Sequence, residues 1–111
     1  MSDYWTPAHD AVEHDNAEAL TRLLADGVDP DEVFSNMTLL THAIDAEGDG
    51  SLQSGEPLTV HHTAVLLAFG ADPELADPKG HTPLDVAAHY GHDLAVHLLR
   101  AHISRRAAGN R

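Results

Sequence analysis

The residues best suited to chemistry lie in one acidic, glycine-containing stretch at residues 45–56. Side chains that carry oxygen recur there, mostly at alternate positions: Asp45, Glu47, Asp49, Ser51, Gln53 and Glu56. A hard cation such as Ca²⁺ binds about six to eight oxygen atoms, and alternate residues of a loop can turn their oxygens inward. Gly50 lies where a loop of this length must turn sharply. These residue types at this spacing predict a calcium site.

The same stretch resembles the calcium loop of an EF-hand, position by position. The resemblance implies that the ligands at the first, third, fifth, seventh, ninth and twelfth places are Asp45, Glu47, Asp49, Ser51, Gln53 and Glu56. The sequence departs from the family at Glu47, which is longer than the usual residue. It also contains one such loop, whereas EF-hands commonly work in pairs. The alternative interpretation is a flexible, acidic insertion that binds no metal.

Helix-start signals recur at three places and define the elements that must position this stretch. Residues 6–8, 38–40 and 82–84 read TPA, TLL and TPL, so each begins with threonine. A threonine hydroxyl at this point accepts from a free backbone N–H, and proline is harmless at the first helical position. Residues 23–30 and 66–73 also repeat each other, as LLADGVDP and LLAFGADP. The chain therefore contains three copies of one helix-turn-helix unit.

A period of about 33 residues, with Thr-Pro-Leu at a helix start and Gly-Ala-Asp in the following loop, resembles the ankyrin repeat. The resemblance implies an all-α solenoid of three helix-turn-helix repeats with short hairpin-like loops. We expect the repeats at about residues 3–35, 36–76 and 77–106, with an insertion at 47–57 and a fraying tail at 107–111. Within them we expect helices at about residues 7–14, 17–26, 38–45 and 58–69, and a last helix that ends near 106.

The charge is strongly negative and unevenly placed. The chain has 18 acidic residues against 6 lysines and arginines, and its formal net charge is −12. Four of the six basic residues lie at residues 100–111, which leaves Arg22 and Lys79 for the rest of the chain. Nucleic-acid binding needs basic side chains that replace the counterions of phosphates, so we do not expect it. An acidic body favours a basic protein partner, although acidity also keeps a small protein soluble.

The composition sets the remaining expectations. A chain of 111 residues provides for one domain, and the absence of cysteine excludes disulfides and thiol-ligated metals. No segment reads as a signal peptide or a membrane span, so we expect a cytoplasmic monomer that does not bind membranes. No nucleophile–base pair, phosphate-binding glycine loop or carboxylate dyad occurs at an informative spacing. We therefore expect no enzymatic activity.

Ten histidines occur in the sequence, and we do not expect a designed zinc or copper site among them. On the predicted helices, five have no partner at the same-face spacing of a zinc pair, apart from accidental ones: His42, His61, His62, His97 and His102. By the resemblance, His9 holds the place of the histidine in the ankyrin Thr-Pro-Leu-His motif, where the family uses it to bond the turns of the repeat together. His92 follows the turn glycine, where the family often has histidine. His14, His81 and His89 fall at family positions that face a binding groove.

The ankyrin resemblance implies a concave protein-binding face. The residues that we place on it are Asp3, Trp5, Glu13, His14, Phe34, Met37, Lys79, His81, His89 and Tyr90. Aromatic side chains often anchor protein interfaces. Trp5 is equally well explained as a cap of the core, Phe34 is better explained as a core residue, and Tyr90 is expected to be exposed.

The predicted function is therefore non-catalytic protein binding through the concave face, with Ca²⁺ organising the inserted loop as a further prediction. One alternative is an acidic immunity protein or antitoxin that blocks a basic toxin such as a nuclease. Another is a calcium-responsive switch or buffer, in which the metal is the main ligand and protein binding is secondary.

Overall fold

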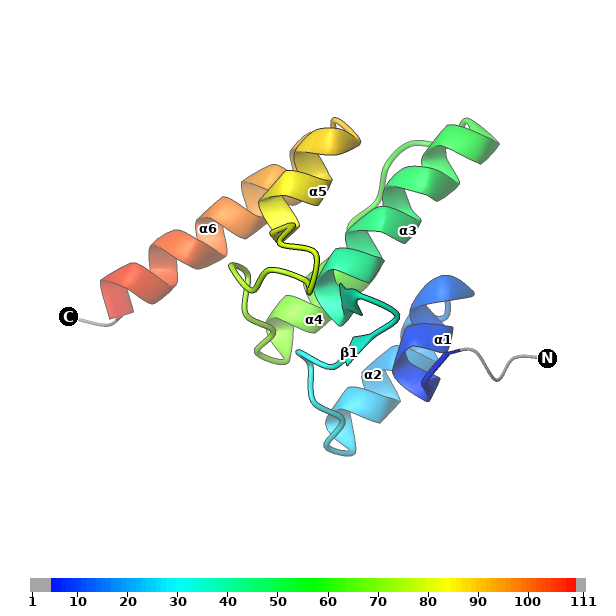
Figure 1. Ribbon diagram of the computed structural model, residues 1–111, viewed down its shortest axis with the longest axis horizontal. Coiled ribbons are helices and arrows are strands. Elements are labelled where there is room, and N and C mark those ends of the chain that lie inside the picture. Colours follow the sequence, from blue (N-terminus) through cyan, green and yellow to red (C-terminus); the bar gives the residue numbers. More distant parts are fainter. Residues whose placement is uncertain (1–4, 110–111) are drawn as a thin grey trace.

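Three helix pairs stacked side by side make up the computed structural model, which describes residues 5–109 (Figure 1). Its elements are α1 (Pro7–Glu13), α2 (Ala17–Ala25), β1 (Val33–Phe34), β2 (Met37–Thr38), α3 (Leu39–Ser54), α4 (His61–Ala68), α5 (Pro83–His89) and α6 (Asp93–Gly109). The first helices of the pairs contact one another in the order α1, α3, α5, and the second helices follow in the order α2, α4, α6. The chain is an all-α repeat solenoid, as predicted.

The three predicted helix starts are confirmed. Thr6, Thr38 and Thr82 are the N-caps of α1, α3 and α5. Each Oγ1 atom accepts a hydrogen bond from the backbone N–H three residues later, at 3.0 to 3.2 Å. These bonds satisfy N–H groups that have no partner within the helix, which is why the threonines fix where the first helix of each pair begins.

A short hairpin leads from the first helix pair into the second. β1 pairs with β2 in antiparallel register, with Val33 opposite Thr38 and Phe34 opposite Met37. The two residues of the turn, Ser35 and Asn36, have φ angles of 55° and 64°. Positive φ at both central residues gives the turn a twist that matches the strands of a hairpin. The hairpin therefore ends directly at Thr38, the cap of α3.

The prediction of a loop at residues 45–56 is wrong, because α3 runs without a break from Leu39 to Ser54. The helix predicted at 38–45 thus continues for more than two turns beyond residue 45, and Gly55, with φ of 75°, ends it in the left-handed conformation. Figure 1 shows the last turns of α3 projecting beyond the neighbouring α1. Ala46, Glu47 and Leu52 are good helix formers, and contacts with neighbouring helices hold the glycine-containing turn.

Two further boundaries differ from the prediction. α4 begins at His61 rather than near residue 58. α6 continues to Gly109, so residues 107–109, predicted as part of a fraying tail, are helical. Ala107 and Ala108 favour this extension, because alanine has the highest helix propensity.

Leucine and alanine side chains fill the space between the two helix layers. The fully buried residues include Leu20, Leu39, Leu40, Ile44, Leu66 and Leu99. Alanines at 8, 43, 87 and 95 are at most 1 % exposed, and their small side chains let the helices approach closely. No helix within residues 5–109 combines the length and the apolar character that a membrane crossing requires.

Candidate functional site

The six predicted calcium ligands do not converge on one point. They are Asp45, Glu47, Asp49, Ser51, Gln53 and Glu56, of which all but the last lie on α3. Residues two apart on a helix are turned by about 200° around its axis, so alternate side chains leave on different faces. Among residues 5–109, no group of three or more His, Cys, Asp or Glu side chains is arranged to hold a metal. The loop geometry on which the calcium prediction depends is not formed.

Glu47 instead caps a neighbouring helix. Its side chain is buried, and its carboxylate accepts hydrogen bonds from the backbone N–H of Thr63 at 3.2 Å and from the Thr63 hydroxyl at 2.7 Å. Thr63 lies in the first turn of α4, whose own cap residue, Val60, makes no side-chain cap bond. Burial raises the pKa of Glu47, although the bonds from Thr63 oppose this change. The sequence carries no signal for this contact, because the partners are 16 residues apart.

A glycine of α3 receives the ring of Tyr90. A Cβ atom placed on Gly48 would lie 2.3 Å from Cγ of Tyr90, closer than carbon atoms approach without displacement. The Tyr90 hydroxyl donates a hydrogen bond to Oδ1 of Asp45 at 2.7 Å. Burial and the Asp45 carboxylate raise the pKa of the Tyr90 hydroxyl. Tyr90 was expected to be exposed; it is half-buried and fastens α5 to α3.

Two neighbouring hollows lie along the hairpin tip, α3 and α5, and together they are called the groove. The larger, of about 410 Å³, is lined by Asp45, His81, Asp85, Val86, His89 and Tyr90. The second, of about 320 Å³, is lined by Ser35, Asn36, Met37, Thr41, Asp45, Asp77, Lys79, His81 and Val86. The two share Asp45, His81 and Val86. Five of the ten residues predicted for binding therefore lie together, namely Met37, Lys79, His81, His89 and Tyr90.

The other residues predicted for binding lie apart from this groove. Glu13 lines a separate pocket beside the end of α3, and His14 lines a hollow between α1 and α2. Trp5 and Phe34 are half-buried, with ring centroids 6.1 Å apart, and take part in an aromatic cluster. Asp3 lies outside the described residues.

A chain of hydrogen bonds through two buried histidines joins the first repeat to the second. Nδ1 of His9 is 2.8 Å from Nδ1 of His42, and Nε2 of His42 is 2.9 Å from Oε1 of Glu13. Nε2 of His9 is 3.3 Å from the carbonyl oxygen of Glu32. The Trp5 ring stacks on His42 with 4.7 Å between ring centroids, so Trp5 covers this row of hydrogen bonds. No partner was predicted for His42, although its distance of 33 residues from His9 equals the repeat period.

The His9–His42 pair resists protonation to a charged imidazolium. One of the two facing Nδ1 atoms must lack a proton, since two N–H groups cannot bond each other. Burial and the neighbouring His42 ring accordingly lower the pKa of His9 to about 4, although the bond to the Glu32 carbonyl opposes them. His9 is 0 % exposed, so water cannot solvate an added charge.

Acidification below neutral pH is therefore expected to destabilise the fold through His9. In the unfolded chain His9 takes up a proton near its ordinary pKa of 6.5, whereas in the folded chain it does so near 4. Its contribution to stability is complete above about pH 6.5 and is lost as the pH falls toward 4. Between about pH 7.5 and about pH 5 the free energy of unfolding should fall by about 2 kcal/mol, measured by urea denaturation.

The exposed His14 provides the matched control for this pH dependence. The His9→Asn variant should lose the pH dependence in this range, while His14→Asn should keep it. An NMR titration of the ring protons gives the pKa of His9 directly. A folded-state value near 6.5, or an unchanged pH profile in His9→Asn, would contradict the expected origin of the effect.

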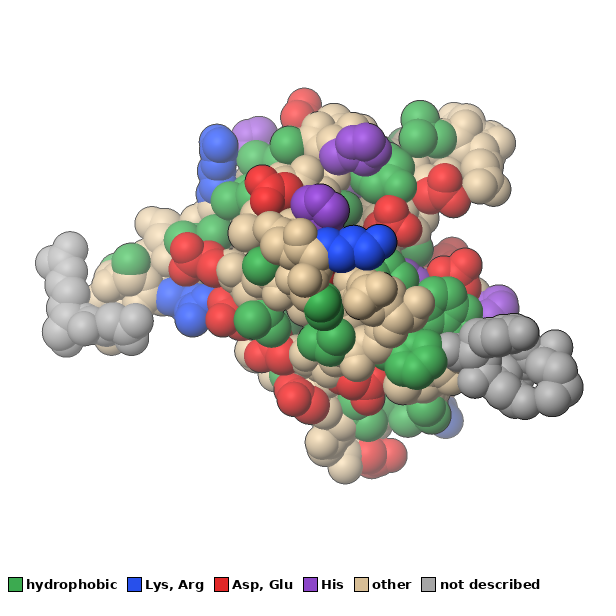
Figure 2. All heavy atoms as spheres, in the orientation of Figure 1, with side chains coloured by type: hydrophobic (Ala, Val, Ile, Leu, Met, Phe, Trp, Pro, Cys, Tyr) green, Lys and Arg blue, Asp and Glu red, His purple; other side chains and the backbone are tan. Residues whose placement is uncertain are grey.

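Acidic side chains dominate the surface around the groove. Figure 2 shows Asp and Glu side chains spread over the visible face, with few Lys or Arg side chains among them. The groove itself has three carboxylates, at Asp45, Asp77 and Asp85, against the single lysine Lys79. Its histidines, His81 and His89, are both exposed. The groove therefore favours positively charged ligands.

The comparisons with known proteins agree with this architecture. The ankyrin repeat family model matches residues 3–33 and 79–108, on either side of the segment that holds the extended α3. A tyrosine-protein kinase of Hydra vulgaris is 33 % identical over 98 residues, which are 85 % of this chain and 12 % of the kinase. The crystal structure of an ankyrin repeat domain from Acinetobacter baumannii AYE superposes with a TM-score of 0.72 at 32 % identity, over 89 % of this chain and 48 % of that one.

The chain thus corresponds to a part of each of these two proteins. Ankyrin repeats generally mediate protein–protein interaction. The threonine-capped helix pairs, their hairpin connection and the family match over more than half of the sequence show that this chain belongs to the ankyrin-repeat family.

Proposed function

We propose that this chain is a non-catalytic protein-binding module that holds a basic partner in the groove of the hairpin tip, α3 and α5. The observation that carries the proposal is that two neighbouring hollows share Asp45, His81 and Val86 in their walls. The side chains on this groove include the exposed His81, His89 and Lys79, which do not hold the helix layers together. In a repeat stack, such surface positions are available for partner recognition.

The charge of the groove supports a basic partner. Carboxylates outnumber the lysine there, and the chain as a whole carries a net charge of −12. Opposite charges across an interface raise the rate of association and select against acidic partners. A basic toxin that the chain blocks is one such partner and remains our alternative. We do not propose the calcium-responsive switch, since residues 45–54 are helical.

A crosslinking experiment tests the face that binds. A photo-reactive benzoylphenylalanine is placed at His81 or His89 in the groove, and for comparison at Leu94, which is 56 % exposed on α6 of the outer layer. Crosslinking from the groove should yield a defined protein adduct, identified by mass spectrometry, that the Leu94 position does not yield. The same adducts from all three positions, or none from the groove, would refute the proposal.

Calorimetry with the purified partner then measures how much the groove contributes to the binding affinity. In calorimetry, the double substitution His81→Ala plus His89→Ala should weaken binding about tenfold, which corresponds to about 1.4 kcal/mol. Leu94→Ala should leave the affinity unchanged within about twofold. Equal losses in both variants would mean that the partner does not sit in the groove.

A further inference from the structure

A second, separate pocket lies on the far side of α3 from the groove's α5 wall. It occupies about 310 Å³ between the α1–α2 turn, the C-terminal half of α3 and the start of α4. Its residues include Glu13 and Asp15 from the turn, Gly50 and Ser51 from α3, and His62 from α4. The extension of α3 beyond residue 45 builds one wall, so the pocket exists because the inserted residues are helical.

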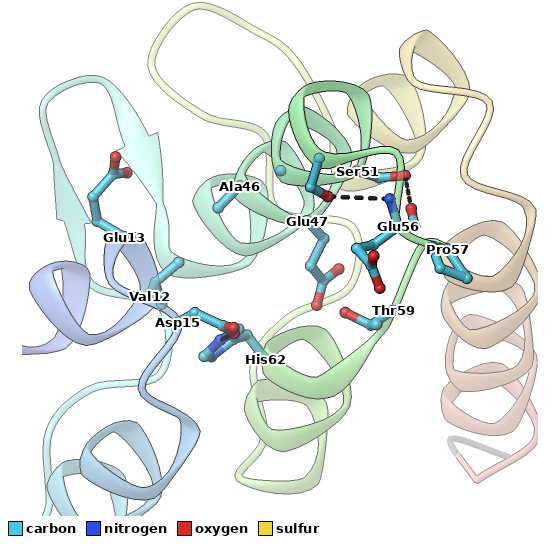
Figure 3. Close-up of a pocket in the computed structure, with 12 residues that line it drawn as sticks. Val12, Glu13, Asp15, Ala46, Glu47, Ser51, Glu56, Pro57, Thr59 and His62 are labelled. Carbon is cyan, nitrogen blue, oxygen red and sulfur yellow. Dashed lines mark hydrogen bonds and ion pairs between the residues drawn. The ribbon is translucent and has the colours of Figure 1, made fainter.

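Carboxylates surround this pocket, and no lysine or arginine lines it. Figure 3 shows the carboxylates of Glu47 and Glu56 turned toward the same opening as Asp15 and His62, while the carboxylate of Glu13 points away from it and bonds to His42. Between Arg22 and Lys79 the sequence contains neither lysine nor arginine. No lysine or arginine among the lining residues neutralises the charge of the pocket, which disfavours a phosphate or other anion as its ligand.

A histidine at the wall of the pocket can also accept a hydrogen bond from a ligand. Nε2 of His62 lies 2.9 Å from Oδ1 of Asp15, and in the tautomer that donates this bond Nδ1 carries a lone pair. His62 is only 2 % exposed, and its Nδ1 is buried with no hydrogen-bond partner. Buried polar atoms are seldom left unpaired. A ligand with several N–H groups would match the acceptors that this wall presents.

The size of the pocket selects among such ligands. Pockets for whole small molecules occupy about 300 to 1,000 Å³, so this one is at the lower limit and suits one long side chain. Arginine presents a planar fork of about five N–H donors, which can bond two carboxylates at once, whereas lysine is a compact point charge. Asp15, with an 89 % exposed side chain that bonds to His62 through Oδ1, and Glu56, which is also exposed, lie where such a fork can reach them.

We propose that this pocket between the α1–α2 turn and the extended α3 receives an arginine side chain of the protein partner. The proposal rests on the protein-binding function and adds a second contact outside the groove. Arginine in this position anchors a basic partner across the first and second repeats.

The test uses a blocked amino acid, so that it does not depend on identifying the partner. ¹⁵N-labelled protein is titrated with N-acetyl-L-arginine methylamide and followed by amide chemical shifts. Saturable shifts are expected at residues 13–15, 47–51 and 59–62. The neutral isostere N-acetyl-L-citrulline methylamide should produce none, and the lysine analogue should bind more weakly. Linear shifts without saturation, or equal shifts with citrulline, would overturn the proposal.

Two double variants that remove the same charge distinguish binding in the pocket from attraction to the acidic protein as a whole. Asp15→Asn plus Glu56→Gln removes two carboxylates from the pocket, and asparagine also tolerates the positive φ of 55° at position 15. Asp26→Asn plus Glu74→Gln removes two exposed carboxylates elsewhere. The pocket variant should weaken arginine binding about tenfold and the control less than about twofold. Equal weakening in both variants would show binding by net charge alone.

The outcome is independent of the crosslinking experiment. Arginine binding in the pocket with no groove adduct would leave the pocket in place and refute the groove as the binding face. A groove adduct with no saturable arginine binding would refute the pocket alone.

Discussion

Replacing Gly48 with alanine is expected to lower the free energy of unfolding by about 2 kcal/mol, although alanine is the better helix former. The new methyl group would lie 2.3 Å from Cγ and 2.6 Å from Cδ1 of Tyr90, so the ring must move. Overpacking of this kind costs about 1 to 3 kcal/mol. The displaced ring also loses its hydrogen bond to Asp45, worth about 1 kcal/mol, and the helix propensity of alanine recovers about the same amount.

Gly50 supplies the matched control, because it lies on the same helix and nothing is within 4 Å of its Cβ position. Gly50→Ala should raise the free energy of unfolding by about 0.5 to 1 kcal/mol. Urea denaturation of both variants therefore gives changes of opposite sign. In a Tyr90→Ala background, Gly48→Ala should become stabilising as well. Destabilisation by Gly48→Ala that persists without Tyr90 would mean that the ring is not its cause.

The glycines of this segment explain why a loop was predicted at residues 45–56. Glycine and alternating acidic residues are typical of a turn that binds a cation, and Gly48, Gly50 and Gly55 occur within eight positions. Gly55 does end the helix, in the conformation that glycine adopts readily. Gly48 serves a different purpose, because it makes space for a ring from another repeat. A single sequence does not distinguish these two uses, since the ring is 42 residues away along the chain.

The repeated features were the predictable ones. Thr6, Thr38 and Thr82 each mark a helix start, because the N-cap hydrogen bond joins residues only three apart. The local sequence is therefore sufficient to place these helix starts. Their recurrence predicted the all-α repeat solenoid. The pairing of His9 with His42 also follows the repeat period, and a search for polar residues at equivalent places of adjacent repeats would have found it.

The candidate groove was predictable in part. Lys79, His81, His89 and Tyr90 occupy positions that the family resemblance assigns to the concave face, and they line its hollows with Met37. The separate pocket was not predictable, because it requires the extension of α3. A helix that continues for more than two turns past residue 45 moves Glu56 away from Asp45 and brings it near the α1–α2 turn.

The Glu47→Ala variant should lose about 2 to 3 kcal/mol of stability, because Glu47 caps α4 from outside that helix. Truncation leaves the N–H and the hydroxyl of Thr63 without their buried acceptor. α4 has no side-chain cap of its own to replace it. Amide hydrogen exchange should show the loss locally, as faster exchange at Thr63 and its neighbours in α4 than in α1.

The variant Glu47→Gln separates the hydrogen bonds from the charge. Glutamine keeps a carbonyl oxygen that can accept from Thr63, and it removes a carboxylate whose pKa is raised by burial. The raised pKa means that the charged form of Glu47 is disfavoured in the fold, so its removal offsets the loss of one acceptor. We therefore expect Glu47→Gln to change stability by less than about 1 kcal/mol. A loss as large as that of Glu47→Ala would show that the charge, through the helix dipole or His92 at 3.4 Å, holds α4 in place.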